Sequence, residues 1–189
     1  MNNFIYEFEN LFALIKANQY IVLYAIGIIW LIQIINFILG YRLNILGIYP
    51  RKIPGLIGIV FAPFLHGSFN HLFFNTIPLY VLANFVLLGG IDKLYCVTCL
   101  VVLVSGFLVW CFSRSGIHVG ASALIMGYFG FLATNAYYHA NVMSILLIIV
   151  SLYYFGGLVS SLLPSLEKNV SWEGHIFGFG AGILATYIC

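Results

Sequence analysis

The residues of this chain best suited to covalent chemistry are a serine and a histidine, each at the start of an apolar stretch. Ser122 stands in the sequence Gly-Ala-Ser-Ala, and His175 stands near the start of the last apolar stretch. A serine hydroxyl is a weak nucleophile that needs a base within hydrogen-bonding reach. Histidine suits that role because the unperturbed pKa of an imidazole lies close to physiological pH. The pair therefore indicates nucleophilic chemistry at a carbonyl group.

A second polar pair lies in another apolar stretch. His71 and Asn75 are four residues apart, so on a helix they share one face and can donate hydrogen bonds in the same direction. Donors placed in this way could stabilise the oxyanion that forms when a nucleophile attacks a carbonyl group.

The composition indicates that these residues sit in a membrane protein. Of 189 residues, 63% are hydrophobic and 6% are charged, whereas soluble domains carry about 25% charged residues. The net charge is +2 without a basic cluster, so nucleic acid is not expected as a partner. Cys96, Cys99 and Cys111 lie within apolar stretches. A disulfide framework or a zinc site is therefore not expected, and the C-x-x-C at Cys96 reads better as small packing residues than as a redox motif.

Apolar stretches of about 20 residues predict helices that cross the bilayer. Six candidates are present, at residues 20–39, 66–88, 94–112, 121–138, 142–163 and 172–189. We therefore predict an all-α, polytopic fold of six transmembrane helices over residues 20–189. Residues 1–19 are predicted either to lie in the membrane interface as a short amphipathic helix or to form a frayed tail.

The order of the predicted spans brings the polar residues together. Spans two, four and six run in the same direction, so their starts lie on one side of the membrane and at similar depth. His71 and Asn75, Ser122, and His175 each lie near one of these starts. Polar side chains are costly inside a membrane, which makes each a functional candidate. Taken singly, Ser122 is more often a small contact between helices, His175 a contact to headgroups, and the His71–Asn75 pair an interhelical hydrogen bond.

The ordered set of motifs resembles the rhomboid family of intramembrane serine proteases. The matching stretches are H71-L-F-F-N75, G120-A-S122-A, G174-H175-I-F-G178-F-G-A-G182, and L46-G-I-Y-P-R51 in the first loop. The resemblance implies that Ser122 is the nucleophile and His175 is its base, with no third carboxylate. It also implies that His71, Asn75 and the backbone N–H of Ser122 hold the oxyanion. Gly178 and Gly182 would let the last helix approach the fourth. Ala123 departs from the pattern, which usually has glycine after the serine.

The function implied by this resemblance is the cleavage of transmembrane segments near the outer membrane face. The expected partners are transmembrane protein substrates and the lipid bilayer, without a metal or a cofactor. The expected location is the bacterial inner membrane. The family places the N-terminus in the cytoplasm, whereas the distribution of Lys and Arg favours the reverse orientation; we follow the family. Glu173 is expected to point to the surface, and His66 to order the first loop.

Two other functions fit parts of the pattern. A non-catalytic protein with the same scaffold would bind transmembrane clients without cleaving them. A metal transporter would use His66, His71 and His175, although three histidines without an embedded carboxylate form a poor ligand set.

Overall fold

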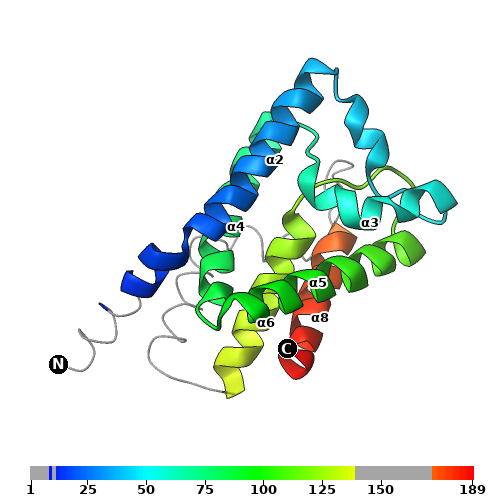
Figure 1. The fold of residues 1–189 in the computed structure, drawn as a ribbon. Coiled ribbons are helices and arrows are strands. Elements are labelled where there is room, and N and C mark those ends of the chain that lie inside the picture. Colours follow the sequence, from blue (N-terminus) through cyan, green and yellow to red (C-terminus); the bar gives the residue numbers. More distant parts are fainter. Residues whose placement is uncertain (1–8, 10–11, 139–171) are drawn as a thin grey trace.

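The chain is mainly helical in the part that the computed structural model describes, which is residue 9, residues 12–138 and residues 172–189 (Figure 1). The long helices there are α2 (Tyr20–Ile38), α4 (Phe69–Leu87), α5 (Ile91–Phe112), α6 (Ser122–Tyr138) and α8 (Trp172–Ile188). The connection from α2 to α4 contains η1 (Arg42–Leu46), η2 (Ile53–Leu56), α3 (Gly58–Phe61) and η3 (Ala62–Phe64). The β pairing found in these ranges is an isolated antiparallel bridge between Ile48 and His118. The predicted all-α class is therefore confirmed.

The number of membrane crossings is confirmed only in part. Two described helices are long and apolar enough to cross a bilayer, α2 with 19 residues and α5 with 22, each with a mean hydropathy of 2.4. A third crossing is obtained if Ile53–Phe64 and α4, which meet at a bend of 69°, form one broken span. Helices α6 and α8 have 17 residues each, fewer than the roughly 20 of a typical span. The predicted span at 142–163 lies outside the described residues, so six crossings stay a prediction.

The predicted interfacial segment is described only toward its end. Residues 12–18 are helical and mostly exposed, while residues 1–8, 10 and 11 lie outside the described part of the chain. The hydroxyl of Tyr80 donates a hydrogen bond to Oε1 of Gln19, which ties the start of α2 to α4. The position of this segment in the membrane interface stays a prediction.

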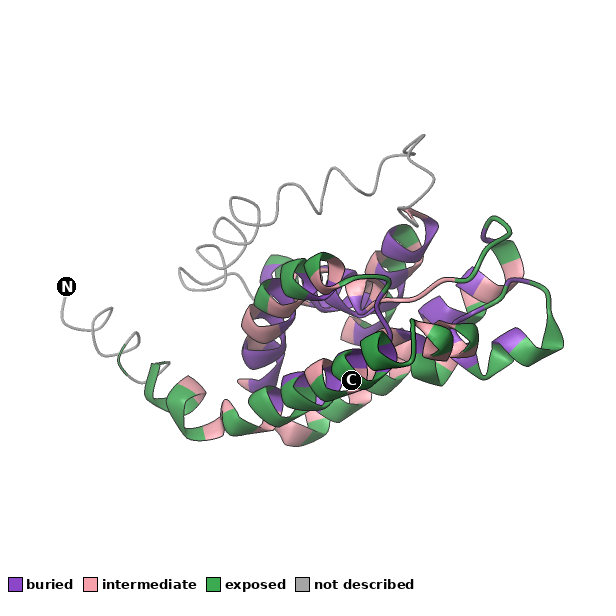
Figure 2. Cartoon of the chain, turned by 90° about the horizontal axis from the view of Figure 1, so that it is seen from above, coloured by how far each residue is buried: buried purple, intermediate pink, exposed green. Residues whose placement is uncertain are grey.

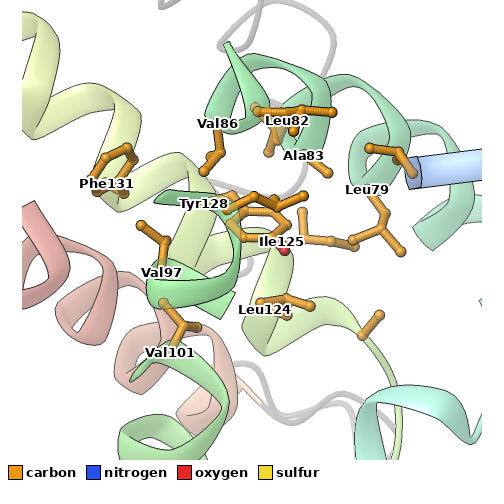
Figure 3. Packing of buried hydrophobic residues seen from close by; sticks show 14 of the residues in the cluster. Leu79, Leu82, Ala83, Val86, Val97, Val101, Leu124, Ile125, Tyr128 and Phe131 are labelled. Carbon is orange, nitrogen blue, oxygen red and sulfur yellow. The ribbon is translucent and has the colours of Figure 1, made fainter. Parts of the chain in front are cut away.

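The core lies where α4, α5 and α6 meet (Figure 3). Leu82 of α4, Val101 of α5 and Ile125 of α6 are at most 1% exposed. The hydroxyl of Tyr128 lies 2.6 Å from the hydroxyl of Thr98 on α5, so this buried phenol has a polar partner. These contacts fix α6 against the two helices before it in the sequence.

The outer faces of the helices are exposed (Figure 2), and they carry many large apolar side chains. Tyr24 and Ile38 of α2 and Phe74 of α4 each expose more than two thirds of their surface, at 72%, 74% and 71%. Large apolar side chains on an exterior of this kind favour lipid over water as the surrounding solvent.

Glycines allow α6 and α8 to pack along each other (Figure 1). A Cβ atom added to Gly178 would overlap the backbone carbonyl of Ala123, and one added to Gly182 would overlap the carbonyl of Gly127. Small residues of this kind let helix backbones come into contact in membranes. The expectation that Gly178 and Gly182 permit a close approach of the last helix is confirmed by these contacts.

The first loop, which is the connection from α2 to α4, packs against the end of α5. The backbone N–H of Arg51 donates to the carbonyl of Trp110 at 2.9 Å, and Nη1 of Arg51 donates to the carbonyl of Ser113 at 2.7 Å. Nε1 of Trp110 donates in return to the carbonyl of Lys52 at 2.9 Å. Because these bonds occupy carbonyl groups that the end of a helix leaves without intrahelical donors, they hold the loop in a fixed position.

A disulfide joins Cys96 near the start of α5 to Cys189 after the end of α8, with the two Cα atoms 5.9 Å apart. The expectation that the cysteines form no disulfide was wrong for this pair. The C-x-x-C does not pair internally, since Cys99 is a free, exposed thiol. The partners are separated by 93 residues in the sequence, and the apolar surroundings of Cys96 carried no sign of this contact.

Candidate active site

Ser122 is the first residue of α6 and is half-buried. The turn before it is fixed from two sides. The N–H of Gly120 donates to the carbonyl of Ala62 at 2.9 Å, and the N–H of Ala121 donates to Nε2 of His66 at 3.4 Å. Gly120 has a φ of +124°, a backbone conformation that favours glycine. The first N–H groups of a helix have no intrahelical acceptor, so the N–H of Ser122 can donate a hydrogen bond to a group outside α6.

His71 and Asn75 lie on the first turns of α4, which begins after a cap. The hydroxyl of Ser68 accepts a hydrogen bond from the N–H of His71 at 3.1 Å, which is the usual N-cap arrangement. A Cβ atom on Gly120 would lie 2.9 Å from Nε2 of His71 and 3.6 Å from Nδ2 of Asn75. Both side chains therefore reach the turn that leads into Ser122.

The Asn75 amide is a buried donor without a partner. The residue is 6% exposed, and Nδ2 has no hydrogen-bond acceptor among the described residues. An unpaired buried donor is unfavourable by about 1–3 kcal/mol. Such a cost is often retained where the donor serves a ligand or a reacting group.

His175 lies on the first turn of α8 and is 6% exposed. It is close enough to His71 for the two rings to interact electrostatically. One turn later, Gly178 contacts Ala123, the residue after Ser122. The structure therefore gathers the predicted residues at one place: Ser122 at the start of α6, His71 and Asn75 from α4, and His175 from α8.

A cavity of about 50 Å³ opens beside Ser122. It is bounded by Ser122 and Gly174, by the loop before α6, by Ala62 and Pro63 of the first loop, and by Ser105 of α5. A site needs only about 10–15 Å³ of this kind of space to hold one water molecule. Ser122 therefore borders a space large enough for water.

Comparison with protein families matches the rhomboid domain over residues 54–189. The chain belongs to the rhomboid family. It is 34% identical over 171 residues to the uncharacterized proteins Rv1337 of Mycobacterium tuberculosis (strain ATCC 25618 / H37Rv) and Mb1372 of Mycobacterium bovis, with 86% of this chain and 71% of each relative covered. It is 32% identical over 170 residues to the uncharacterized protein ML1171 of Mycobacterium leprae (strain TN), with 86% of this chain and 67% of that relative covered.

Membership in the rhomboid family fixes the general class of the protein. Rhomboid proteins act on transmembrane substrates in membranes and are generally serine proteases, although some are inactive. Together with the apolar helices, the family makes this chain an integral membrane protein.

His66 takes a place in this rhomboid site that its sequence position did not suggest. Its imidazole is fully buried, accepts the hydrogen bond from Ala121, and meets the His71 ring edge-on with centroids 5.1 Å apart. Its backbone carbonyl also accepts from Nδ2 of Asn44 at 3.4 Å, a contact with the first loop. His66 therefore orders the first loop, as predicted, and in addition supports the turn before Ser122.

Glu173 is buried, and the expectation that it points to the surface was wrong. Its Oε1 atom accepts a hydrogen bond from Nε of Arg114 at 2.6 Å, and its Oε2 atom accepts from Nη2 at 3.1 Å. The hydrogen bonds to Glu173 raise the pKa of the Arg114 guanidinium above its usual value. A carboxylate is buried at this point because a cation lies against it.

Metal ligation was a further possibility for the histidines. His66 and His71 are in contact. Within residues 12–138 and 172–189, however, no group of three His, Cys, Asp or Glu side chains is placed to hold a metal ion.

Proposed function

We propose that this rhomboid protein is an intramembrane serine endopeptidase that cleaves transmembrane segments near the outer membrane face, with Ser122 and His175 as its catalytic dyad. The observation that supports this most directly is the buried, unpaired amide of Asn75 beside Gly120. A donor without an acceptor, next to the first N–H groups of a helix that begins with serine, suits a negative charge that exists only during the reaction.

The proposed reaction has two steps. The Ser122 oxygen attacks the peptide carbonyl carbon while His175 takes the hydroxyl proton, and the negative charge on the carbonyl oxygen is held by His71, Asn75 and the Ser122 N–H. The C–N bond then breaks, and His175 gives its proton to the leaving amine. Water attacks the resulting ester with His175 as the base, which releases the carboxylic acid and restores Ser122.

The proposed substrate is the end of a transmembrane helix that unwinds locally. The carbonyl groups of an intact helix are occupied by their own hydrogen bonds, so a peptide must lose helical structure before it can be attacked. The cavity of about 50 Å³ beside Ser122 suits a small side chain at the cleavage point and also the water of the second step. We place the protein in the bacterial inner membrane as a multi-pass protein, with this end of the helices facing outward.

The function is tested by labelling the purified protein with a fluorophosphonate, which reacts only with an activated serine. We expect wild-type protein to be labelled at Ser122 and to cleave some members of a panel of single-span membrane proteins. The Ser122→Ala variant should do neither. Binding of panel members without labelling or cleavage would instead favour a non-catalytic protein that holds transmembrane clients.

Replacing Asn75 by alanine is expected to lower kcat by about 10²–10³-fold, because one oxyanion donor is lost. The KM should change little, since this donor pairs with charge that develops only in the transition state. The measurement is the steady-state kinetics of cleavage of a fluorescent single-span substrate in detergent micelles.

The matched control for this variant is Asn84→Ala. Asn84 is a buried asparagine on the same helix, and its Nδ2 atom donates to the carbonyl of Tyr80 at 2.8 Å. It has no contact with Gly120, so its loss should affect stability more than kcat. An equal fall of kcat in the two variants would show that Asn75 acts through the folding of α4 and not on the oxyanion.

A further inference from the structure

The start of α8 is tied to the loop before α6 by an ion pair between the buried carboxylate of Glu173 and the guanidinium of Arg114, whose side chain is 48% exposed. Glu173 lies two residues before His175 and is 5% exposed. Besides its two bonds to the guanidinium of Arg114, its Oε1 atom lies 3.3 Å from the backbone N of Arg114, which donates to it. The guanidinium also lies over the ring of Trp172, 6.0 Å from the ring centroid. Arg114 therefore contacts two consecutive residues in the first turn of α8.

The loop that carries Arg114 is itself held in place. The Arg114 carbonyl lies 3.0 Å from Nε2 of His118, and the backbones of His118 and Ile48 exchange two hydrogen bonds at 2.8 and 3.0 Å. Gly120 is bonded to Ala62, as described above. These bonds hold the loop before α6, from Arg114 to Ser122, against the first loop. A side chain that binds α8 to Arg114 therefore also fixes the position of α8 relative to Ser122.

Because of helix geometry, the ion pair at Glu173 also sets the direction of the His175 side chain. Two residues along an α-helix correspond to a rotation of about 200°. A bond that holds Glu173 against Arg114 on one side of α8 therefore turns His175 toward the opposite side of the helix. The close glycine contacts of α8 at Gly178 and Gly182 lie one and two turns farther along the helix, and they limit the distance between the helices more than the rotation of the first turn.

We propose that Arg114 and Glu173 are positioning residues that set the rotation and depth of α8 so that His175 reaches Ser122. This inference rests on the proposed protease function. Neither residue touches the reacting atoms. They change the fraction of molecules in which His175 is aligned with Ser122. A displacement of the base by about 1 Å is enough to lower the reaction rate by about 10²-fold.

Three variants separate positioning from stability: Arg114→Gln, Arg114→Gln with Glu173→Gln, and Arg114→Lys. The first leaves a buried carboxylate without its cation, so both the melting temperature and the rate of fluorophosphonate labelling should fall. The double variant has no unpaired charge, so its melting temperature should recover. Its labelling should stay about 10–100-fold slower than wild type, because the bidentate tie is still missing. Lysine keeps the positive charge but lacks the two parallel N–H donors of the guanidinium, so the labelling rate of this variant should lie between those of wild type and the double variant.

The experiment measures the labelling rate of folded protein in detergent micelles across pH 5–9, together with melting temperatures. Lys52→Gln removes an exposed cation from the same end of the protein and serves as the charge control. Wild-type labelling rates in the double variant would overturn the positioning role while leaving the protease proposal intact. Absence of labelling in the wild-type protein would overturn the protease proposal, and this inference with it.

Discussion

Replacing Ser122 or His175 by alanine is expected to lower kcat for substrate cleavage by about 10⁴-fold or more in each case, and the double variant should be no worse than either single one. The nucleophile and its base act as one unit, so removing either leaves the other without a role. The measurement is single-turnover cleavage of a single-span substrate with excess enzyme, which detects slow residual reactions. Binding of the substrate should be nearly unchanged, because neither side chain is required to hold it.

The control for these variants is Ser115→Ala, which removes an exposed hydroxyl from the loop before α6. This variant should cleave at the wild-type rate. Melting temperatures of the four variants check that each is folded. Because His175 is 6% exposed, its replacement is expected to lower the melting temperature more than that of Ser122. If the fold-decrease in kcat of the double variant equals the product of the two single decreases, Ser122 and His175 act independently, which is incompatible with a dyad.

The convergence of the site followed from the sequence because it depends only on the direction of the helices. Polar residues at the starts of alternate apolar stretches must reach the same side of a membrane. In the structure His71 lies against Gly120 in the turn before Ser122, and α8 contacts α6 at Gly178, one turn after His175. The start of α6 at Ser122 was also within one residue of the predicted span. The apolar stretches and their order along the chain can be read directly from a single sequence, and the alternating direction of the spans follows from that order.

The contacts that the sequence did not show are those between distant polar residues. His66 was expected only to order the first loop. Because α4 begins at Phe69, His66 lies before the helix, and its spacing from His71 in the sequence does not predict the contact between the two rings. Glu173 was expected at the surface, and nothing in the sequence indicated its partner, because Arg114 is 59 residues earlier. In both cases the pairing arises from tertiary packing, which spacing along the chain does not encode.

Replacing Gly178 by alanine is expected to lower kcat by about 10²-fold and to destabilise the protein by about 1–3 kcal/mol. The added methyl group would overlap the carbonyl of Ala123, and overpacking of a tight helix contact is relieved only by moving the helices apart. Because Ala123 follows Ser122 directly and His175 lies one turn before Gly178, this movement separates the base from the nucleophile. Kinetics of fluorophosphonate labelling and thermal unfolding in the same detergent measure the two effects.

Gly180→Ala provides the matched comparison on the same helix. A Cβ atom at Gly180 meets nothing within 4 Å, so this variant receives the same methyl group without the overlap. Alanine favours a helix over glycine by about 1 kcal/mol, so its melting temperature should equal or exceed that of wild type, with unchanged labelling. If both variants lose activity to the same degree, the loss comes from removing a flexible residue from α8. The close contact between α6 and α8 would then not be what holds His175 near Ser122.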